Sequence, residues 1–205
     1  MLAALAVAAL AALTDWWAVL SMRPAVEAVA KPLVMVAAIV AAAVGIDDDR
    51  VRWFIMIGLG LGLVGDVLLL PALDRFVAGL AAFLVGHLAY VGAFVVVGSR
   101  SGWLVAGIGF VALAGPLVGR PIVGGAAASL QVPVLAYILV IAAMVSTAVG
   151  TAVAPIMIGG VMFAGSDGIL GWDRFVTPRS DRRVVVHLLY HGGQLLIVIG
   201  SIALV

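Results

Sequence analysis

Residues 76–97 read FVAGLAAFLVGHLAYVGAFVVV, an apolar run whose one ionisable side chain is that of His87. A helix needs about 20 such residues to cross the hydrocarbon core of a membrane. The run is rich in alanine and leucine and does not alternate polar with apolar residues, so a membrane-spanning strand is excluded. The stretch predicts a transmembrane helix, and it indicates the class of the whole chain.

The composition of all 205 residues agrees with that class. Hydrophobic residues make up 65% and charged residues 10% of the chain, against about 45–50% and about 25% in soluble globular proteins. The mean hydropathy is +1.31. These values exclude a soluble domain and a disordered chain. The formal net charge of +1 offers no basic stripe for nucleic acid, and a chain without cysteine has no disulfides or thiolate metal sites.

The apolar runs divide the chain into membrane spans. We expect an all-α, polytopic membrane helix bundle that forms one domain, 1–205, with about eight helices near residues 2–20, 32–46, 52–70, 76–97, 102–119, 131–149, 151–170 and 184–204. The second run is short for a span and must extend into its flanks. No charge separates the sixth and seventh runs near Gly150, so seven helices, with one long and broken, is the alternative.

Interfacial residues predict the orientation of the bundle. All five tryptophans fall near expected helix ends, where their rings prefer to lie. Basic residues concentrate in cytoplasmic loops. The first, third, fifth and seventh loops carry Arg23, Lys31, Arg75, Arg120, Arg174, Arg179, Arg182 and Arg183, and the even loops carry Arg50, Arg52 and Arg100. We therefore expect the odd loops to be cytoplasmic and both termini to lie outside.

A weak internal repeat is visible in the order of the polar residues. Gly65-Asp66, Asp74-Arg75-Phe76 and His87-Leu88-Ala89-Tyr90 recur as Ser166-Asp167, Asp173-Arg174-Phe175 and His187-Leu188-Leu189-Tyr190. Four helices in each half, 1–100 and 101–205, would give the halves the same orientation, as in a parallel 4+4 repeat.

Ionisable residues within membrane helices are costly and usually mark a functional site or line a wet cavity. The candidates here are Asp15, Asp66, His87, Asp167, His187 and His191, with Tyr90, Tyr137, Tyr190 and Gln194 as polar partners. The last helix carries His187, Tyr190, His191 and Gln194 on one face. On the expected topology these groups converge on a cavity open to the cytoplasmic leaflet.

Each candidate also has a structural interpretation. The two aspartates Asp66 and Asp167 could pair with Arg75 or Arg174 at helix ends. His87 could serve one interhelical hydrogen bond. We expect His187 and His191, next to the basic seventh loop, to be interfacial.

Several stretches, taken in order, resemble the YhhN family. They are Lys31-Pro32-Leu33, Gly62–Leu69 (GLVGDVLL), Phe76–Tyr90 (FVAGLAAFLVGHLAY), Tyr137 with Met144, Gly160–Asp167 (GVMFAGSD) and Tyr190 with Gln194. The resemblance covers nearly the whole chain. His187 and His191 are not part of the family pattern.

The resemblance implies a lysoplasmalogenase-like ether hydrolase. Such enzymes cleave the vinyl ether bond of lysoplasmalogens to a fatty aldehyde and a glycerophospho-base. The expected partners are a lysophospholipid substrate and membrane lipids, with no nucleic acid, no cofactor and no metal. The expected location is the bacterial inner membrane.

The chemistry predicts which residues carry the reaction. A vinyl ether is protonated at carbon, and water then attacks the oxocarbenium ion, so the site needs a proton donor and an anion or base. In a low-dielectric cavity, burial and mutual repulsion keep one of two carboxyl groups protonated while the other is ionised. Glycoside hydrolysis divides the work in the same way. We assign catalysis to Asp66 and Asp167. The expected binding or orienting residues are Lys31, His87, Tyr90, Tyr137, Ser166, Tyr190 and Gln194.

Two other functions compete with this one. The i, i+4 pair His187 and His191, with the aspartates, could hold zinc in a metal-dependent lipid hydrolase. A transporter or lipid-binding protein would fit the parallel repeat. Release of aldehyde from a lysoplasmalogen separates the enzyme from a carrier, and a chelator separates a zinc enzyme from a carboxylate enzyme.

Overall fold

A computed structural model describes the whole chain except residues 71–72, 74 and 205. The described part is helical, without strands, and contains eight helices long and apolar enough to cross a membrane. These are α1 (Leu2–Leu20), α2 (Pro24–Gly45), α3 (Asp49–Leu68), α4 (Phe76–Val97), α5 (Ser101–Gly125), α6 (Ala128–Gly150), α7 (Ala154–Phe175) and α8 (Arg183–Ile202). A short 3₁₀ turn, η1 (Ser180–Arg182), precedes α8. The expected all-α membrane bundle is confirmed.

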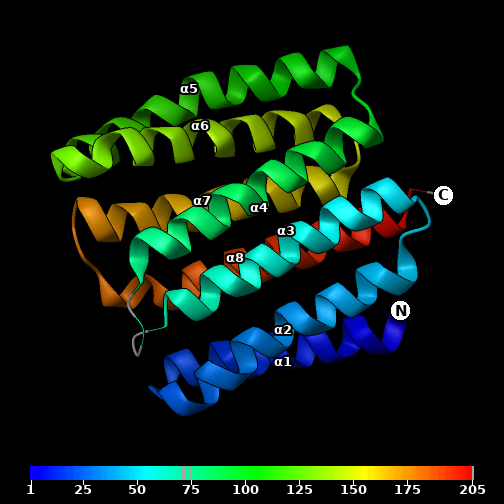
Figure 1. The fold of residues 1–205 in the computed structure, drawn as a ribbon, viewed down its shortest axis with the longest axis horizontal. Coiled ribbons are helices and arrows are strands. Elements are labelled where there is room, and N and C mark those ends of the chain that lie inside the picture. Colours follow the sequence, from blue (N-terminus) through cyan, green and yellow to red (C-terminus); the bar gives the residue numbers. More distant parts are fainter. Residues whose placement is uncertain (71–72, 74, 205) are drawn as a thin grey trace.

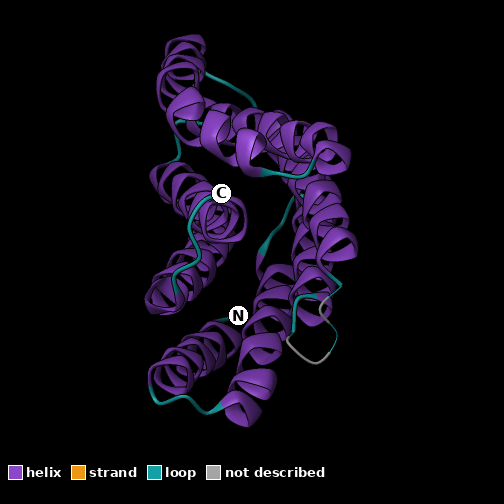
Figure 2. Cartoon of the chain, turned by 90° about the vertical axis from the view of Figure 1, so that its left-hand side faces the viewer, coloured by secondary structure: helices purple, strands orange, loops and turns teal. Residues whose placement is uncertain are grey.

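Consecutive helices pack as antiparallel pairs (Figure 1). The pairs α1–α2 and α5–α6 lie at opposite edges of the bundle, as the turned view in Figure 2 also shows. Between them, α4 packs on α6, and α8 packs on α1 and α2. Both termini lie at one end of the bundle, and the odd-numbered connections lie at the other, which we call the odd-loop end (Figure 1). The alternation that the loop charges predicted is therefore present, and its sidedness stays a prediction.

The junction near Gly150 is a true helix break. Helix α6 ends there, and Ala152 takes a left-handed backbone conformation with φ of 56°. The Thr151 hydroxyl donates to the Ala148 carbonyl and accepts from the Val153 amide, which satisfies groups freed by the break. A proline follows in the first turn of α7, where its missing amide hydrogen costs nothing. Eight helices are confirmed, and the seven-helix alternative is wrong.

Two predicted helix boundaries are wrong for the same reason, and a third, the end of the seventh helix, lies at Phe175 rather than residue 170. The second helix begins at Pro24 rather than residue 32, and the fifth ends at Gly125 rather than residue 119. Both extensions contain charged residues and prolines, which favour a boundary in a sequence-based prediction. Proline fits the first turn of α2, and prolines inside membrane helices are tolerated because neighbouring groups satisfy the freed carbonyls.

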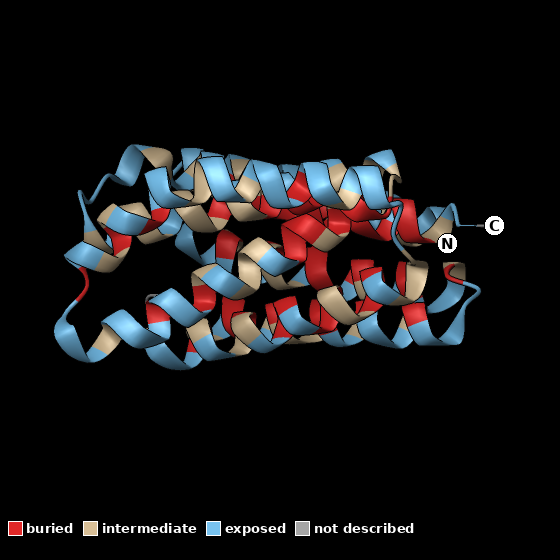
Figure 3. Cartoon of the chain, turned by 90° about the horizontal axis from the view of Figure 1, so that it is seen from above, coloured by how far each residue is buried: buried red, intermediate tan, exposed pale blue. Residues whose placement is uncertain are grey.

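The buried residues face the middle of the bundle, and the outer faces of the helices are exposed, as expected of a lipid-facing surface (Figure 3). Helices α3 and α4 approach closely because glycines face aromatic rings. A Cβ atom on Gly58 would lie 2.7 Å from the Tyr90 ring, and one on Gly65 would lie 2.5 Å from the Phe83 ring. Small residues allow such backbone approach in membranes. This packing places the ends of α3 and α4 around the polar interior.

The parallel 4+4 repeat stays a prediction. Asp74, which belongs to its first copy, lies outside the described residues. The pairs α3–α4 and α7–α8 correspond in order, but their histidines have different partners: His87 contacts Asp167, and His187 contacts Asp15.

Candidate active site

Polar side chains gather in the interior of the odd-loop half of the bundle, enclosed by helices whose outer faces are apolar. The buried ones include Asp15, Glu27, Asp66, His87, Ser166, His187, His191 and Gln194. A buried polar group without a partner is costly, so the partners of each group decide what it does. Seven helices, all except α5, contribute to this set or to its contacts.

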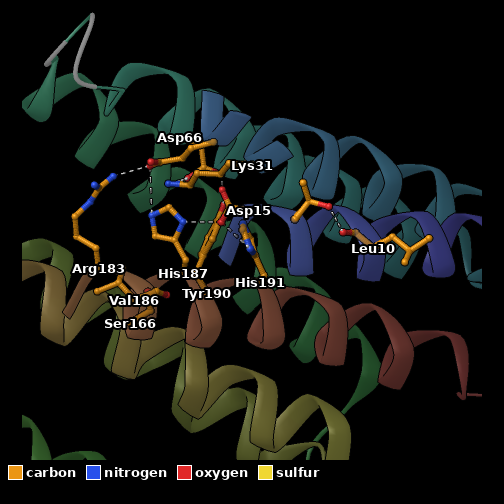
Figure 4. A network of polar contacts seen from close by, with 12 residues as sticks. Leu10, Asp15, Lys31, Asp66, Ser166, Arg183, Val186, His187, Tyr190 and His191 are labelled. Carbon is orange, nitrogen blue, oxygen red and sulfur yellow. Dashed lines mark hydrogen bonds and ion pairs between the residues drawn. The ribbon is translucent and has the colours of Figure 1, made fainter. Parts of the chain in front are cut away.

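Asp66, near the end of α3, forms a buried ion pair. Its Oδ1 atom lies 2.9 Å from Nζ of Lys31 on α2, and the two side chains are 2% and 15% exposed. Tyr190 on α8 donates its hydroxyl to Oδ2 at 2.9 Å (Figure 4). Both carboxylate oxygens are thus engaged by donors, one of them a cation. Both donors favour the ionised form of the Asp66 carboxyl group, and its burial opposes that form.

No lysine or arginine of the described residues lies within 4 Å of the Asp167 carboxyl group on α7, which instead meets a tyrosine and a histidine. Tyr137 on α6 donates its hydroxyl to Oδ2 at 2.7 Å. His87 on α4 places Nε2 3.3 Å from the same oxygen, and its Nδ1 lies 2.7 Å from the Phe83 carbonyl. A carbonyl only accepts, so Nδ1 carries a proton. In neutral histidine, Nε2 is then a free acceptor facing the carboxyl group.

Aromatic rings pack between the surroundings of Asp66 and those of Asp167. The Phe163 ring, fully buried, lies 4.5 Å from the His87 ring and 5.3 Å from the Tyr190 ring. The Tyr90 ring lies 6.2 Å from the Phe163 ring, and its hydroxyl donates to the side-chain oxygen of Gln194. Tyr90 and Gln194 therefore bond each other, and neither donates to an aspartate.

Ser166 and the arginines at the helix ends serve other contacts than expected. The Ser166 hydroxyl donates to the Val186 carbonyl at 3.0 Å and ties α7 to α8. The Arg174 guanidinium lies 4.6 Å from the centre of the Phe76 ring. The alternative in which Asp66 or Asp167 pairs with Arg75 or Arg174 is therefore wrong, because other donors hold both carboxyl groups.

The histidines of α8 are buried, so the expectation that they are interfacial is wrong. Nδ1 of His187 forms a hydrogen bond of 2.7 Å with Oδ2 of Asp15 on α1, and Asp15 is fully buried. His187 Nε2 lies 3.9 Å from Glu27, which in turn accepts from Arg183 at 2.7 Å. His191, one helical turn after His187 on α8, places Nδ1 3.7 Å from Oδ2 of Asp15. The close contact of α8 with α1 and α2 turns this face inward.

Glu27 is a site residue that the sequence analysis missed. It lies in the first turns of α2, in the stretch that was assigned to a loop. A carboxylate that close to a helix end resembles a solvated surface group in sequence. Glu27 and Lys31 are one helical turn apart, so a longer second helix would have placed both on one face. This spacing was the signal in the sequence that could have revealed Glu27.

A cavity of about 410 Å³ brings these groups together, and we call it the polar cavity. Asp66 and Asp167 both line it, together with Ser166, Tyr190, His187 and Glu27. Arg179 and Arg183 line its outer part. Arg179, beyond the end of α7, forms an exposed pair with Asp181, and that carboxylate raises the pKa of Arg179. Among the described residues, no three His, Asp or Glu side chains are arranged to hold a metal ion, so the zinc alternative gains no support.

The fold and this cavity define a class: a multi-pass integral membrane protein in which two aspartates line one cavity inside the helix bundle. The YhhN family pattern matches residues 26–201, and the chain belongs to the YhhN family. It shares 33% identity over 181 residues with the lysoplasmalogenase of Mycobacterium bovis, an alignment that covers 81% of this chain and 67% of that protein. It shares 31% identity with lysoplasmalogenase TMEM86B of Mus musculus and 32% with that of Homo sapiens.

The shared region is only part of these relatives. The chain spans 64% of the mouse protein and 59% of the human one, while the alignments cover 73% and 68% of this chain. No solved structure matches the chain at a significant level. The resemblance inferred from the sequence motifs is confirmed at the level of the family.

Proposed function

We propose that this protein is a lysoplasmalogenase: it hydrolyses the vinyl ether bond of a single-chain alkenyl glycerophospholipid to a fatty aldehyde and a glycerophospho-base. The observation that carries the proposal is the contrast between two carboxyl groups on one cavity. Asp66 faces a cation, and Asp167 faces a histidine whose other nitrogen is committed to a carbonyl. The names of the relatives support the choice of substrate.

The contrast supports a proposed role for each carboxyl group. A buried carboxylate without a cation is costly, so the Asp167–His87 pair is most stable when it holds one proton and is neutral overall. That proton is available to a carbon placed beside Oδ2. Asp66 is kept ionised by Lys31 and serves as the anion that stabilises the oxocarbenium ion and accepts a proton from water. Asp167 is the acid and Asp66 is the base.

The steps balance in protons. Asp167 protonates the carbon of the double bond that is remote from oxygen, which makes the adjacent carbon an oxocarbenium ion. Water adds to that carbon and gives a proton to Asp66, so a hemiacetal forms. When the hemiacetal collapses, Asp167 takes its hydroxyl proton and Asp66 returns a proton to the departing glycerol oxygen. Aldehyde and alcohol leave, and both carboxyl groups regain their starting states.

The remaining polar residues position the substrate and the carboxyl groups. Tyr137 and Tyr190 each hold one aspartate. Lys31 is held inside the polar cavity by Asp66. Arg179 and Arg183 pair with Asp181 and Glu27, but their side chains are half-exposed at the mouth of the cavity, where they can meet the phosphate. We place this mouth in the cytoplasmic leaflet of a bacterial inner membrane, on the support of the basic odd loops.

Aldehyde release by the purified, reconstituted protein tests the proposal. A vinyl ether lysolipid should yield aldehyde, and the matching saturated ether lipid should not. Asp66→Asn and Asp167→Asn remove the titrating groups and should each lower turnover by about 100-fold or more. Because the two carboxyl groups act as a unit, the double variant should be little worse than the worse single one.

Near-normal turnover of either single variant would make that aspartate structural and refute the pair. A wild-type protein that binds both lipids and releases no aldehyde would favour the carrier alternative. Inhibition by a chelator and recovery with zinc would replace the carboxylate mechanism with the metal one.

A further inference from the structure

A second cavity, of about 330 Å³, lies between α4, α5, α6 and α7, and we call it the apolar cavity. Its lining is almost entirely hydrocarbon. The polar side chains that reach it are those of Asp167 and Tyr137, which bond each other. Of the other described lining residues, Phe83 alone takes part in a hydrogen bond of the catalytic site, through its main-chain carbonyl. The proposed chemistry leaves this space unexplained.

The two cavities meet at the acid. Leu69, Phe83, Asp167 and Leu170 line both of them. A molecule that occupies both therefore has one charged or polar part and one apolar part, and its junction lies beside Asp167. A single-chain amphiphile has this division.

The apolar cavity extends along the helices on both sides of Asp167, and further toward the middle of the bundle than toward the odd-loop end. The register of α5 against α7 shows this, since a Cβ atom on Gly168 would meet Val118 at 3.5 Å and one on Gly171 would meet Ile122 at 3.2 Å. The lining continues on α5 from Val118 back to Phe110, about 12 Å of helix. The cavity is therefore elongated along the helices, as an extended hydrocarbon chain is.

We propose that the apolar cavity binds the alkenyl chain of the substrate and that Gly115 sets the length it accepts. This inference rests on the proposed function, because the vinyl ether of a lysoplasmalogen lies where the chain joins the glycerol. With the chain in the apolar cavity and the phosphate in the polar one, the reacting double bond lies beside Asp167. Apolar walls with a few convergent polar groups are typical of small-molecule sites.

Gly115 is the position at which the wall is open. It lines the apolar cavity one turn before Val118, and a Cβ atom added there would meet no atom within 4 Å. A Cβ atom at this position displaces no neighbour, and we expect a larger side chain built on it to enter the cavity. Gly109, on the same helix, is also free of neighbours but is exposed and does not line the cavity. The two glycines form a matched pair.

The test compares Gly115→Leu with Gly109→Leu on vinyl ether lysolipids of short and long chain. We expect Gly115→Leu to lower kcat/KM for the long chain by about 10-fold or more, the scale of about 1.4 kcal/mol of lost binding, and to spare the short chain. Gly109→Leu should leave both unchanged. If Gly115→Leu leaves long-chain turnover intact, or reduces both chains equally, the length role is refuted.

A binding measurement separates this inference from the proposed function. A saturated ether lysophospholipid with a diazirine at the chain end is photolysed with the protein in lipid nanodiscs, and the adducts are located by mass spectrometry. Adducts on residues that line the apolar cavity, such as Ile141, support the site even if no aldehyde is ever released. Adducts confined to the exposed outer residues of α5, such as Leu113 and Leu117, overturn it.

Discussion

The ion pair between Lys31 and Asp66 allows a quantitative test of the site. Asp66 is 2% exposed, so it has lost nearly all contact with water, and Lys31 is its one cation within 4 Å among the described residues. Removing one partner of a buried pair costs about 3–5 kcal/mol, because the remaining charge is uncompensated. The hydroxyl of Tyr190, at 2.9 Å, still donates to the carboxylate after Lys31→Met. We therefore expect a loss near the lower limit, about 3 kcal/mol of unfolding free energy.

A second substitution should restore most of this loss. Asp66→Asn in the Lys31→Met background removes the unpaired charge and keeps an oxygen that accepts from Tyr190. The double variant should lie within about 1 kcal/mol of the wild type, since replacing a whole buried pair is often neutral. The free energy of unfolding is measured by titration with denaturing detergent in mixed micelles. Arg23→Met, at the exposed start of α2, serves as a control and should change stability by about 0.5 kcal/mol or less. If the double variant is as unstable as Lys31→Met alone, the buried pair is not the source of the loss.

Two further predictions concern the buried histidine network and the orientation of the bundle. Asp15→Leu leaves Nδ1 of His187 without its acceptor and should cost about 1–3 kcal/mol of unfolding free energy. Asp15→Asn keeps an acceptor oxygen and should cost less, and equal losses in the same unfolding titration would contradict the assignment of this bond. Single cysteines at Ser99 and Ser180, in a chain that has none, should react with impermeant thiol reagents from opposite sides of the membrane, with Ser180 cytoplasmic. Labelling of Ser99 from the cytoplasm would invert the proposed topology.

The amino-acid sequence by itself determined the features that depend on neighbouring residues along the chain. Most apolar runs are long enough to cross a bilayer, and in lipid a run of that length satisfies its backbone only as a helix, so the class of the fold follows from local composition. The choice between seven and eight spans, at the uncharged junction near Gly150, was decided by the structure. The distribution of basic residues among the loops is equally local. The ordered motifs around Asp66, His87 and Asp167 identified the family.

Helix ends and the partners of the buried groups were decided by packing. Whether Pro24 or Pro32 begins α2 depends on what satisfies the freed backbone groups, and the wrong boundary hid Glu27. A histidine near a basic loop, such as His187, can lie on a lipid-facing, interfacial or buried face of its helix. The neighbouring residues in the sequence are the same in all three cases, so they do not distinguish them.

Only the tertiary structure distinguished the two aspartates. In the sequence, Asp66 and Asp167 follow similar glycine-rich motifs, and neither motif contains the group that its carboxyl meets. The packing of α2 on α3 places Lys31 on Asp66, and the packing of α4 and α6 around α7 places His87 and Tyr137 on Asp167. The free energy of a buried carboxyl group depends on the charges and donors within a few ångströms, and residues distant in sequence supply them. The proposed division into acid and base therefore rests on helix packing.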